Sequence, residues 1–173
     1  KNVLITGVSS GIGRTLTKRL TKMGYKVWGI ARRRVLLKSL SEEINNPSKF
    51  IFSDLDISNE STWGKLVEEL IKKRFIPDIV IFNAAILEND LEKGLEIKST
   101  ERMVNTNFYG VIRGVAHLLP KVKSGTQFLL ISSSSAFKGS GVEGVGYAAS
   151  KAAVSIAFES LYQRYRNNSI HFK

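Results

Sequence analysis

The 173-residue sequence contains no cysteine, which excludes disulfide bonds and thiolate metal sites and is typical of a reducing compartment. It also has no stretch approaching the roughly 20 uninterrupted apolar residues that a membrane-spanning helix needs. Lys1 lies almost at the start of the first predicted strand, so we expect no signal peptide. Together these absences predict a cytoplasmic protein without a metal site.

Acidic residues are the scarcer charged type: 15 Asp and Glu stand against 26 Lys and Arg, a formal net charge of +11. Such a charge can indicate nucleic acid, a membrane or a phosphorylated ligand as partner. The basic residues are dispersed, however, with small clusters at residues 32–34 and 72–74, and acids are mixed among them. We therefore expect no nucleic-acid or membrane partner, and a local use of a few cations instead.

Short apolar runs alternate with helical periods along the whole chain. The runs lie at residues 3–6, 27–31, 50–52, 79–82, 128–131 and 169–172, and the amphipathic segments at residues 12–23, 34–44, 61–73, 100–119 and 148–166. Continuous apolar strands are buried on both faces, and their alternation with helices favours a parallel sheet with right-handed crossovers. The sequence predicts one α/β domain over residues 1–173, a doubly wound parallel sheet in three α/β/α layers.

The stretch TGVSSGIG, residues 6–13, joins the first predicted strand to the first helix. Its glycines Gly7, Gly11 and Gly13 can allow a tight turn, bring backbone close to a pyrophosphate and let the helix pack closely on the sheet. Free N–H groups at the helix start would attract the phosphate charge. The alternative is an ordinary glycine-rich turn in which Ser10 caps the helix.

This pattern, Thr-Gly-x-x-x-Gly-Ile-Gly, resembles the cofactor fingerprint of the short-chain dehydrogenase/reductase family, and its spacing resembles the single-domain reductase branch. The resemblance extends over the whole chain and implies a Rossmann-type fold that binds NAD(P)(H). Family members continue beyond the sixth strand into a Pro-Gly turn and a substrate-covering segment, so we expect the C-terminal part of the family fold to be absent from this chain. Within the turn it implies cofactor contacts from Gly7, Ser9, Ser10, Gly11, Ile12 and Gly13.

The end of the second strand bears on the choice between NAD and NADP. An acid there would bind the ribose 2′-hydroxyl of NAD, whereas this chain has Ala31 followed by Arg32, Arg33 and Arg34. A guanidinium can bind a phosphate through two parallel charge-assisted hydrogen bonds. We interpret Arg32 as the 2′-phosphate contact and Arg33 as the second candidate, which favours NADP(H). The alternative, a solvated helix start, is weakened because cations are not favoured near a helix N-terminus.

Two further loops match the family's cofactor site. In similar proteins an Asp followed by an aliphatic residue borders the adenine, and Asp56 and Ile57 match that place; the alternative is that Asp56 or Ser58 caps the next helix. The fourth strand ends in Phe82-Asn83-Ala84-Ala85, where the family usually has Asn-Asn-Ala-Gly, so the chain departs at two of the four positions. Ala85 adds one methyl group beside the cofactor and removes no reactive group.

The candidate chemistry lies at the start of the last long helix. Tyr147 and Lys151 are four residues apart, so they share a helix face with β-carbons about 6 Å apart. A free tyrosine, with a pKa of about 10, is a poor proton donor and acceptor at neutral pH, so the pair needs a partly enclosed pocket in which the cation favours the phenolate. In the family, the tyrosine is the general acid and base, and the lysine also binds the nicotinamide ribose.

A serine and an asparagine complete the predicted catalytic set. Residues 132–135 are four serines at the end of the fifth strand; Ser134 has the family's spacing to Tyr147, and Ser133 is the second candidate. Such a hydroxyl can donate to a substrate carbonyl oxygen. Asn107 lies inside a predicted helix, where asparagine has modest propensity. In the family this asparagine bends the helix and holds a water linked to the lysine, whereas we expect Asn105 to be a surface side chain.

The sequence therefore predicts an NADP(H)-dependent oxidoreductase that interconverts a carbonyl compound and its alcohol, acting on a small molecule. A non-catalytic NADP(H)-binding sensor or scaffold of the same fold is the alternative, and a basic nucleic-acid-binding protein is a third hypothesis. The predicted helices at residues 100–119 and 148–166 are apolar over more surface than one sheet covers, and in similar proteins they pair between subunits. We expect a homodimer or homotetramer.

Overall fold

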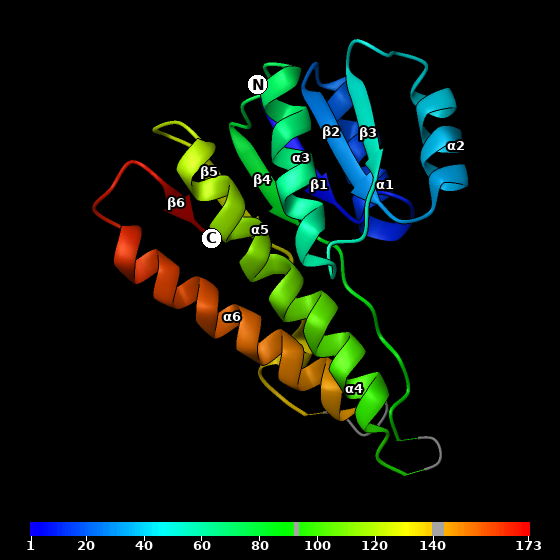
Figure 1. The fold of residues 1–173 in the computed structure, drawn as a ribbon, viewed down its shortest axis with the longest axis vertical. Helices are drawn as coiled ribbons and strands as arrows, with labels where there is room; N and C mark the ends of the chain where they lie inside the picture. Colours follow the sequence, from blue (N-terminus) through cyan, green and yellow to red (C-terminus); the bar gives the residue numbers. More distant parts are fainter. Residues whose placement is uncertain (92–93, 140–143) are drawn as a thin grey trace.

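The computed structural model describes residues 1–91, 94–139 and 144–173 and contains one parallel sheet between helices (Figure 1). The strands lie in the order β3-β2-β1-β4-β5-β6, and every neighbouring pair is parallel. The predicted doubly wound fold is therefore confirmed, and the direction of winding reverses between β1 and β4. The strands are β1 (Asn2–Thr6), β2 (Lys26–Ala31), β3 (Phe50–Asp54), β4 (Ile79–Phe82), β5 (Gln127–Leu130) and β6 (His171–Phe172).

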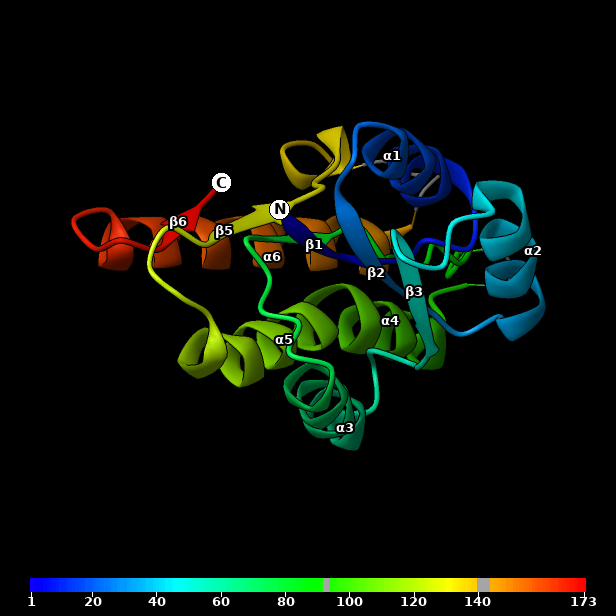
Figure 2. The same ribbon diagram turned by 90° about the horizontal axis from the view of Figure 1, so that it is seen from above.

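Helices cover both faces of the sheet (Figure 2). Helices α1 and α2 pack on one face, and α3, α5 and α6 pack on the other, which makes the three layers predicted from the sequence. The α-helices are α1 (Gly11–Lys22), α2 (Arg34–Ile44), α3 (Glu60–Lys72), α4 (Ile97–Val104), α5 (Gly110–Leu118) and α6 (Val145–Tyr165). Short 3₁₀ turns, η2 (Leu119–Lys121) and η3 (Ser134–Ala136), follow α5 and β5.

The predicted helix over residues 100–119 is instead two helices joined by a π-helical turn. Helix α4 begins three residues earlier than predicted, and the turn η1 (Asn105–Tyr109) separates it from α5. A π turn adds one residue to a helical turn and is often found at functional sites. The apolar pattern alone did not separate the two helices, whereas the resemblance implied a bend at Asn107, which lies within this turn.

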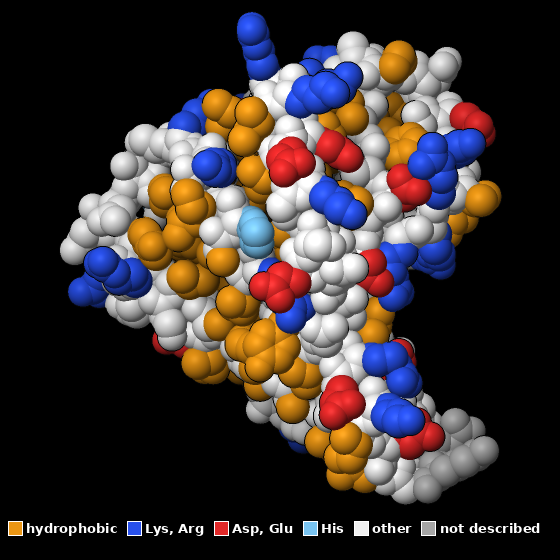
Figure 3. Space-filling view, in the orientation of Figure 1, with side chains coloured by type: hydrophobic (Ala, Val, Ile, Leu, Met, Phe, Trp, Pro, Cys, Tyr) orange, Lys and Arg blue, Asp and Glu red, His pale blue; other side chains and the backbone are white. Residues whose placement is uncertain are grey.

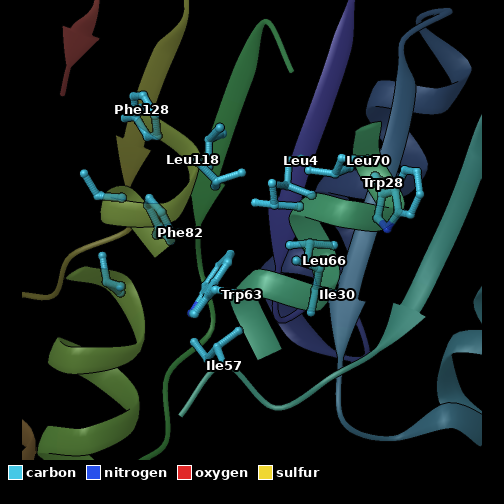
Figure 4. Packing of buried hydrophobic residues seen from close by; sticks show 14 of the residues in the cluster. Leu4, Trp28, Ile30, Ile57, Trp63, Leu66, Leu70, Phe82, Leu118 and Phe128 are labelled. Atoms are coloured by element: carbon cyan, nitrogen blue, oxygen red, sulfur yellow. The ribbon is translucent and has the colours of Figure 1, made fainter. Parts of the chain in front are cut away.

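Alternation of side chains along the buried strands divides the core into two clusters. In β1, Val3 and Ile5 face α1 and α2, whereas Leu4 faces α3. The larger cluster, on the α3 side, contains Trp63 and Phe82, whose ring centroids are 6.1 Å apart (Figure 4). Aromatic side chains bury large apolar areas, so this cluster fixes α3 and α5 against the sheet.

Charged side chains of both signs are interspersed on the face of the molecule that carries α3 and α5 (Figure 3). Several cations on the molecule have carboxylate partners: Arg34 contacts Asp54, and Lys123 contacts Asp78. Among the described residues, no helix is both long enough and apolar enough to cross a membrane. Nor does any group of three or more His, Asp or Glu side chains in the described part of the chain form a candidate metal site.

Close packing of α5 on α3 and β4 generates the first prediction. A β-carbon on Gly114 would lie 2.7 Å from both Phe82 and Trp63, whereas one on Gly64, in α3, would meet nothing within 4 Å. Overpacking costs about 1–3 kcal/mol, so Gly114→Ala should lower the free energy of unfolding by that amount. Gly64→Ala, the control, should raise it by up to about 1 kcal/mol because alanine favours a helix. Urea unfolding measures both, and equal effects would contradict this packing.

Candidate active site

A pocket of about 280 Å³ lies at the carboxyl ends of the strands, where the winding reverses between β1 and β4. Ligands bind at this place in open α/β sheets because the loops after adjacent strands diverge there. The pocket gathers most of the residues that the sequence predicted to bind a cofactor. Its lining is Gly7, Ser9, Ser10, Ile12, Ile30, Ala31, Arg32, Arg33, Leu55, Asp56, Ile57, Asn83, Ala84, Ala85, Ile86 and Thr106.

The glycine turn forms one wall of the pocket and has no room for side chains at two positions. Gly7 has φ +77°, and a β-carbon there would lie 2.7 Å from the Ala84 backbone. A β-carbon on Gly13 would collide with the Gly7 carbonyl oxygen. Gly11 has φ +55° and open space around it. The three glycines therefore have three different surroundings: Gly7 lies against the loop after β4, Gly13 lets the start of α1 pack on the turn, and Gly11 has a left-handed backbone with open space beside it.

Asn83 and Thr6 hold this turn against the end of β4. The Asn83 side-chain amide donates to the backbone oxygens of Thr6 and Gly7, both at 3.1 Å. The fully buried Thr6 hydroxyl accepts from the N–H groups of Asn83 and Ala84. Asn83 therefore lines the pocket, and its side chain holds the glycine turn in place. The sequence analysis missed Thr6, although a threonine at a strand end before glycine offers the hydroxyl.

Ser10 does not cap helix α1. It occupies the N-cap position, but its side chain makes no capping hydrogen bond. Instead the Arg33 guanidinium donates to both Ser9 Oγ, at 3.0 Å, and Ser10 Oγ, at 2.8 Å. The alternative of an ordinary capped turn is wrong in this respect, because both hydroxyls face the cation.

The three consecutive arginines have three different surroundings. Arg33 is held at the glycine turn, and Arg32 lies 3.7 Å from Asp56 with its side chain 57% exposed. Arg34 points elsewhere and donates to both carboxylate oxygens of Asp54, holding the pKa of that carboxyl below its usual value. Arg32 and Arg33 line the pocket, whereas the alternative of a solvated helix start describes Arg34.

Asp56 and Ile57 line the pocket, and neither Asp56 nor Ser58 caps α3. Asn59 is the cap, its side chain accepting from Ser61 N–H, while Asp56 Oδ1 accepts from the N–H and hydroxyl of Ser58. The capping alternative considered for these two residues is therefore wrong.

Ala85 does not have a positive φ: among the described non-glycine residues, only Asn45 and Arg74 do. The backbone at Ala85 therefore does not require glycine.

Tyr147 and Lys151 lie on one face of α6, close to its N-terminus. The Lys151 ammonium is 5.9 Å from the centroid of the half-buried Tyr147 ring. Lys151 is only 5% exposed, and its Nζ donates to the Ile131 carbonyl oxygen at 2.9 Å. Burial lowers the pKa of this lysine. The pair therefore has the partly enclosed surroundings that the sequence analysis required.

The four serines after β5 differ in what their hydroxyls contact. Ser133 caps η3 and lies 2.9 Å from Ser135 Oγ, and Ser132 lies 2.7 Å from Ser155 Oγ. Ser134 is exposed, and its hydroxyl has no hydrogen-bond partner among the residues that the structure describes. Of the two candidates, Ser134 has the hydroxyl that is available to a ligand.

Asn107 lies in the π turn and is 2% exposed. Its Oδ1 accepts from Ile86 N–H at 2.8 Å, and its Nδ2 donates to the Ile86 carbonyl oxygen and to Ser150 Oγ. Ser150 in turn donates to the Tyr147 carbonyl oxygen at 2.8 Å. Asn107 therefore connects a pocket-lining loop to helix α6 at Ser150, the residue before Lys151, and lies within the helix distortion.

Asn105 is not the surface side chain that the sequence analysis expected. It is half-buried, donates to the Ser58 carbonyl oxygen at 3.3 Å and accepts from Arg113 at 2.8 Å. The π turn thus presents one asparagine to the loop after β3 and another to the loop after β4.

The fold is a doubly wound parallel α/β sheet with a pocket at its switch point, and comparison with known proteins gives the family. The short chain dehydrogenase model matches residues 1–173. The chain therefore belongs to the short-chain dehydrogenase family, whose members are oxidoreductases that use NAD(P)(H).

Individual relatives agree with this assignment. The chain is 31% identical over 157 residues to an NADPH-dependent pterin aldehyde reductase of Arabidopsis thaliana, covering 89% of this chain and 64% of the relative. It is 36% identical over 131 residues to a benzil reductase of Saccharomyces cerevisiae, covering 72% of this chain and 49% of that protein. The chain thus spans about half to two thirds of the length of these relatives.

A solved structure shares the arrangement. A short chain dehydrogenase/reductase of Saccharomyces cerevisiae superposes with a TM-score of 0.87 at 27% identity, covering 96% of this chain and 66% of that one.

Burial of Asn107 generates the second prediction. Asn107→Ala would leave the N–H and carbonyl oxygen of Ile86 without their side-chain partner, and each unpaired buried group costs about 1–3 kcal/mol. The variant should lose at least that much unfolding free energy in urea. Asn105→Ala should lose less, because Arg113 still donates to the Ser58 carbonyl oxygen. Equal losses of unfolding free energy in the two variants would contradict this difference between the asparagines.

Proposed function

We propose that this chain is the cofactor-binding and catalytic part of an NADP(H)-dependent oxidoreductase that interconverts a carbonyl compound and its alcohol. The observation that carries the proposal is that Lys151 lies 5.9 Å from the Tyr147 ring on a helix that Asn107 joins, through Ser150, to Ile86. Ile86 lines the pocket together with Arg32 and Arg33, whereas Tyr147 and Lys151 are not among its lining residues. The family supports an enzyme acting on carbonyl or alcohol groups.

The pocket fits a dinucleotide in three respects. Its glycine wall has no β-carbons where a pyrophosphate must approach backbone, it lies at the topological switch point, and it has cations at one end. Gly7, Gly11, Ile12 and Gly13 would hold the pyrophosphate, and Asp56 and Ile57 the adenine. Asn83, Ala84 and Ala85 would face the ribose next to the nicotinamide, together with Tyr147 and Lys151. When bound, the cofactor supplies or accepts a hydride.

Arg32 and Arg33 support NADP(H) over NAD(H). Arg33 is bound only to neutral hydroxyls of Ser9 and Ser10 among the described residues, so its charge is available to a phosphate. Arg32 is exposed beside Asp56 at the same end of the pocket. The small side chain of Ala31 leaves room where an acid would repel a 2′-phosphate. A relative described as NADPH-dependent agrees with this preference.

The chain's own groups move the proton. In the reduction direction, the Tyr147 hydroxyl donates its proton to the carbonyl oxygen, and in oxidation the phenolate accepts it back. The Lys151 cation favours the phenolate because opposite charges attract strongly where water is excluded. The free Ser134 hydroxyl donates a hydrogen bond to the same carbonyl oxygen. Asn107 connects the π turn to α6 and supports the proton path by way of its Ser150 contact.

We further propose that residues 1–173 act as one domain, that the protein is cytoplasmic, and that it forms a homodimer or homotetramer. Exposed apolar side chains on the π turn and on α6, such as Tyr109 and Ile156, favour assembly through these helices. The substrate is a small carbonyl compound or alcohol.

Substitution of Tyr147 tests the mechanism. Tyr147→Phe removes only the hydroxyl, so NADPH affinity and fold should stay unchanged while kcat for carbonyl reduction by the full-length protein falls about 100- to 10,000-fold. Tyr162→Phe makes the same change on an exposed part of α6 and should keep parental turnover. Lys151→Ala should lose both activity and cofactor affinity. Near-parental turnover by Tyr147→Phe would refute the assignment, and NADPH binding without any parental turnover would favour a non-catalytic sensor.

The arginines test the cofactor. Ala31→Asp combined with Arg32→Gln should weaken NADPH binding relative to NADH about ten- to a hundredfold, because charge-assisted hydrogen bonds contribute about 1.5–3 kcal/mol. Arg33→Gln should act in the same direction. Arg34→Gln is the matched control and should leave the ratio unchanged, since Arg34 contacts Asp54 outside the pocket. Fluorescence titration with both nucleotides measures the ratio, and an unchanged ratio in the first two variants would exclude a 2′-phosphate site here.

A further inference from the structure

Asp90 is a fully buried carboxylate between β4 and α4 whose contacts lie far away in the sequence. Its Oδ1 accepts from Val145 N–H at 2.9 Å, 55 residues later. Its Oδ2 accepts from Gly146 N–H at 2.7 Å and from the Thr100 hydroxyl at 2.8 Å. Neither the cofactor pocket nor the catalytic set includes this residue, so its burial has no explanation in the proposed reaction.

The two N–H groups that Asp90 binds belong to the first turn of helix α6. The first N–H groups of a helix have no partner within it, and a side chain at the N-cap usually accepts one of them. Here the N-cap is Gly144, which has no side chain and no capping bond. Asp90, which belongs to another loop, therefore acts as the cap of α6. Its negative charge lies at the positive end of the helix dipole.

The backbone around this contact is shaped to admit the carboxylate. Gly144 has φ +78°, and a β-carbon there would collide with Asp90 Oδ1. A β-carbon on Gly146 would lie 3.1 Å from Asp90 Oδ2 and 2.7 Å from the Thr100 backbone. The two glycines thus let the loop after β4 approach the start of α6 closely.

Tyr147, the residue predicted to transfer the proton, directly follows Gly146, whose N–H donates to Asp90. On its other side, Tyr147 O accepts from Ser150, which is bound to Asn107. We propose that Asp90 is a positioning residue for Tyr147: its carboxylate fixes the first turn of α6 and thereby the place of the phenol. This inference rests on the proposed function.

The charge state of Asp90 fits this role. Burial raises the pKa of its carboxyl, but the hydrogen bonds from Gly146, Thr100 and Val145 outweigh burial and hold the pKa below the usual value. The group is thus a carboxylate at neutral pH, with two oxygens that can each accept from the helix. An amide in its place offers one oxygen and would set an NH₂ group against one of the two N–H groups.

The test compares Asp90→Ala and Asp90→Asn with Asn59→Ala, which removes a helix cap from α3. A displaced reacting group can cost up to about 100-fold, so Asp90→Ala in the full-length protein should lower kcat about 10- to 100-fold with NADPH affinity and substrate KM nearly unchanged. Asp90→Asn should lie between Asp90→Ala and the parent. Asn59→Ala removes a more exposed cap, so it should lose unfolding free energy, though less than Asp90→Ala, and keep parental kcat. Hydrogen exchange should show lost protection at residues 145–150 only in the Asp90 variants.

A double-mutant cycle separates positioning from general destabilisation. If Asp90 acts through Tyr147, adding Asp90→Ala to Tyr147→Phe should change the residual kcat less than about twofold, because the hydroxyl being positioned is already gone. An equal fall in both backgrounds, parental kcat in Asp90→Ala, or unchanged exchange in α6 would overturn the inference. If Asp90→Ala does not fold, Thr100→Val removes one donor to Asp90, and a smaller kcat loss at constant NADPH affinity is expected.

Failure of the proposed function looks different from failure of this inference. If Tyr147→Phe keeps parental turnover, the proposed mechanism is wrong, and the role of Asp90 falls with it. If Tyr147→Phe loses turnover while Asp90→Ala keeps it, the mechanism stands and only the positioning role is wrong.

Discussion

The whole site depends on a close backbone approach at the carboxyl ends of β1 and β4. Gly7 lies against the Ala84 backbone, and Gly13 lies against the Gly7 carbonyl oxygen, so neither position accepts a side chain. Asn83 closes this contact by donating to the backbone of Thr6 and Gly7. Because only a short turn separates α1 from the end of β1, the start of α1, the second-strand arginines and the loop after β4 all meet at one pocket.

Helix α6 is held against the rest of the molecule by different kinds of contact along its length. Val154 and Phe158 pack in the apolar core further along. At the N-terminal end the contacts are hydrogen bonds: Asp90 to the first turn, Asn107 to Ser150, and Lys151 to the Ile131 carbonyl oxygen. Hydrogen bonds are directional, whereas apolar contacts tolerate small shifts, so this arrangement fixes the orientation of the helical turns that carry Tyr147 and Lys151.

The sequence was sufficient for the fold and for most of the residues that meet at the pocket, and insufficient for the partner that each side chain takes. The doubly wound parallel sheet follows from apolar runs and crossover handedness, which are local or general properties. The contacts of Ser10, Asn59 and Asn105 depend on which loop lies opposite, and the sequence does not specify that distance. Asp90 shows the same limit: nothing next to it in the chain distinguishes it from a loop carboxylate, because the two helix N–H groups that it binds lie 55 and 56 residues away.

The net charge of the chain is a poor guide to function because neighbouring cations have different electrostatic surroundings. Arg34 is paired with a carboxylate, so little of its charge acts at a distance, and Arg32 has a looser partner 3.7 Å away. Arg33 is oriented by two neutral hydroxyls, which fix its direction without neutralising it. A cation so held gives an incoming phosphate the most attraction for the least reorganisation. The orientation of the Arg33 guanidinium at the pocket is therefore better evidence on the kind of ligand than the excess of basic residues over the whole surface.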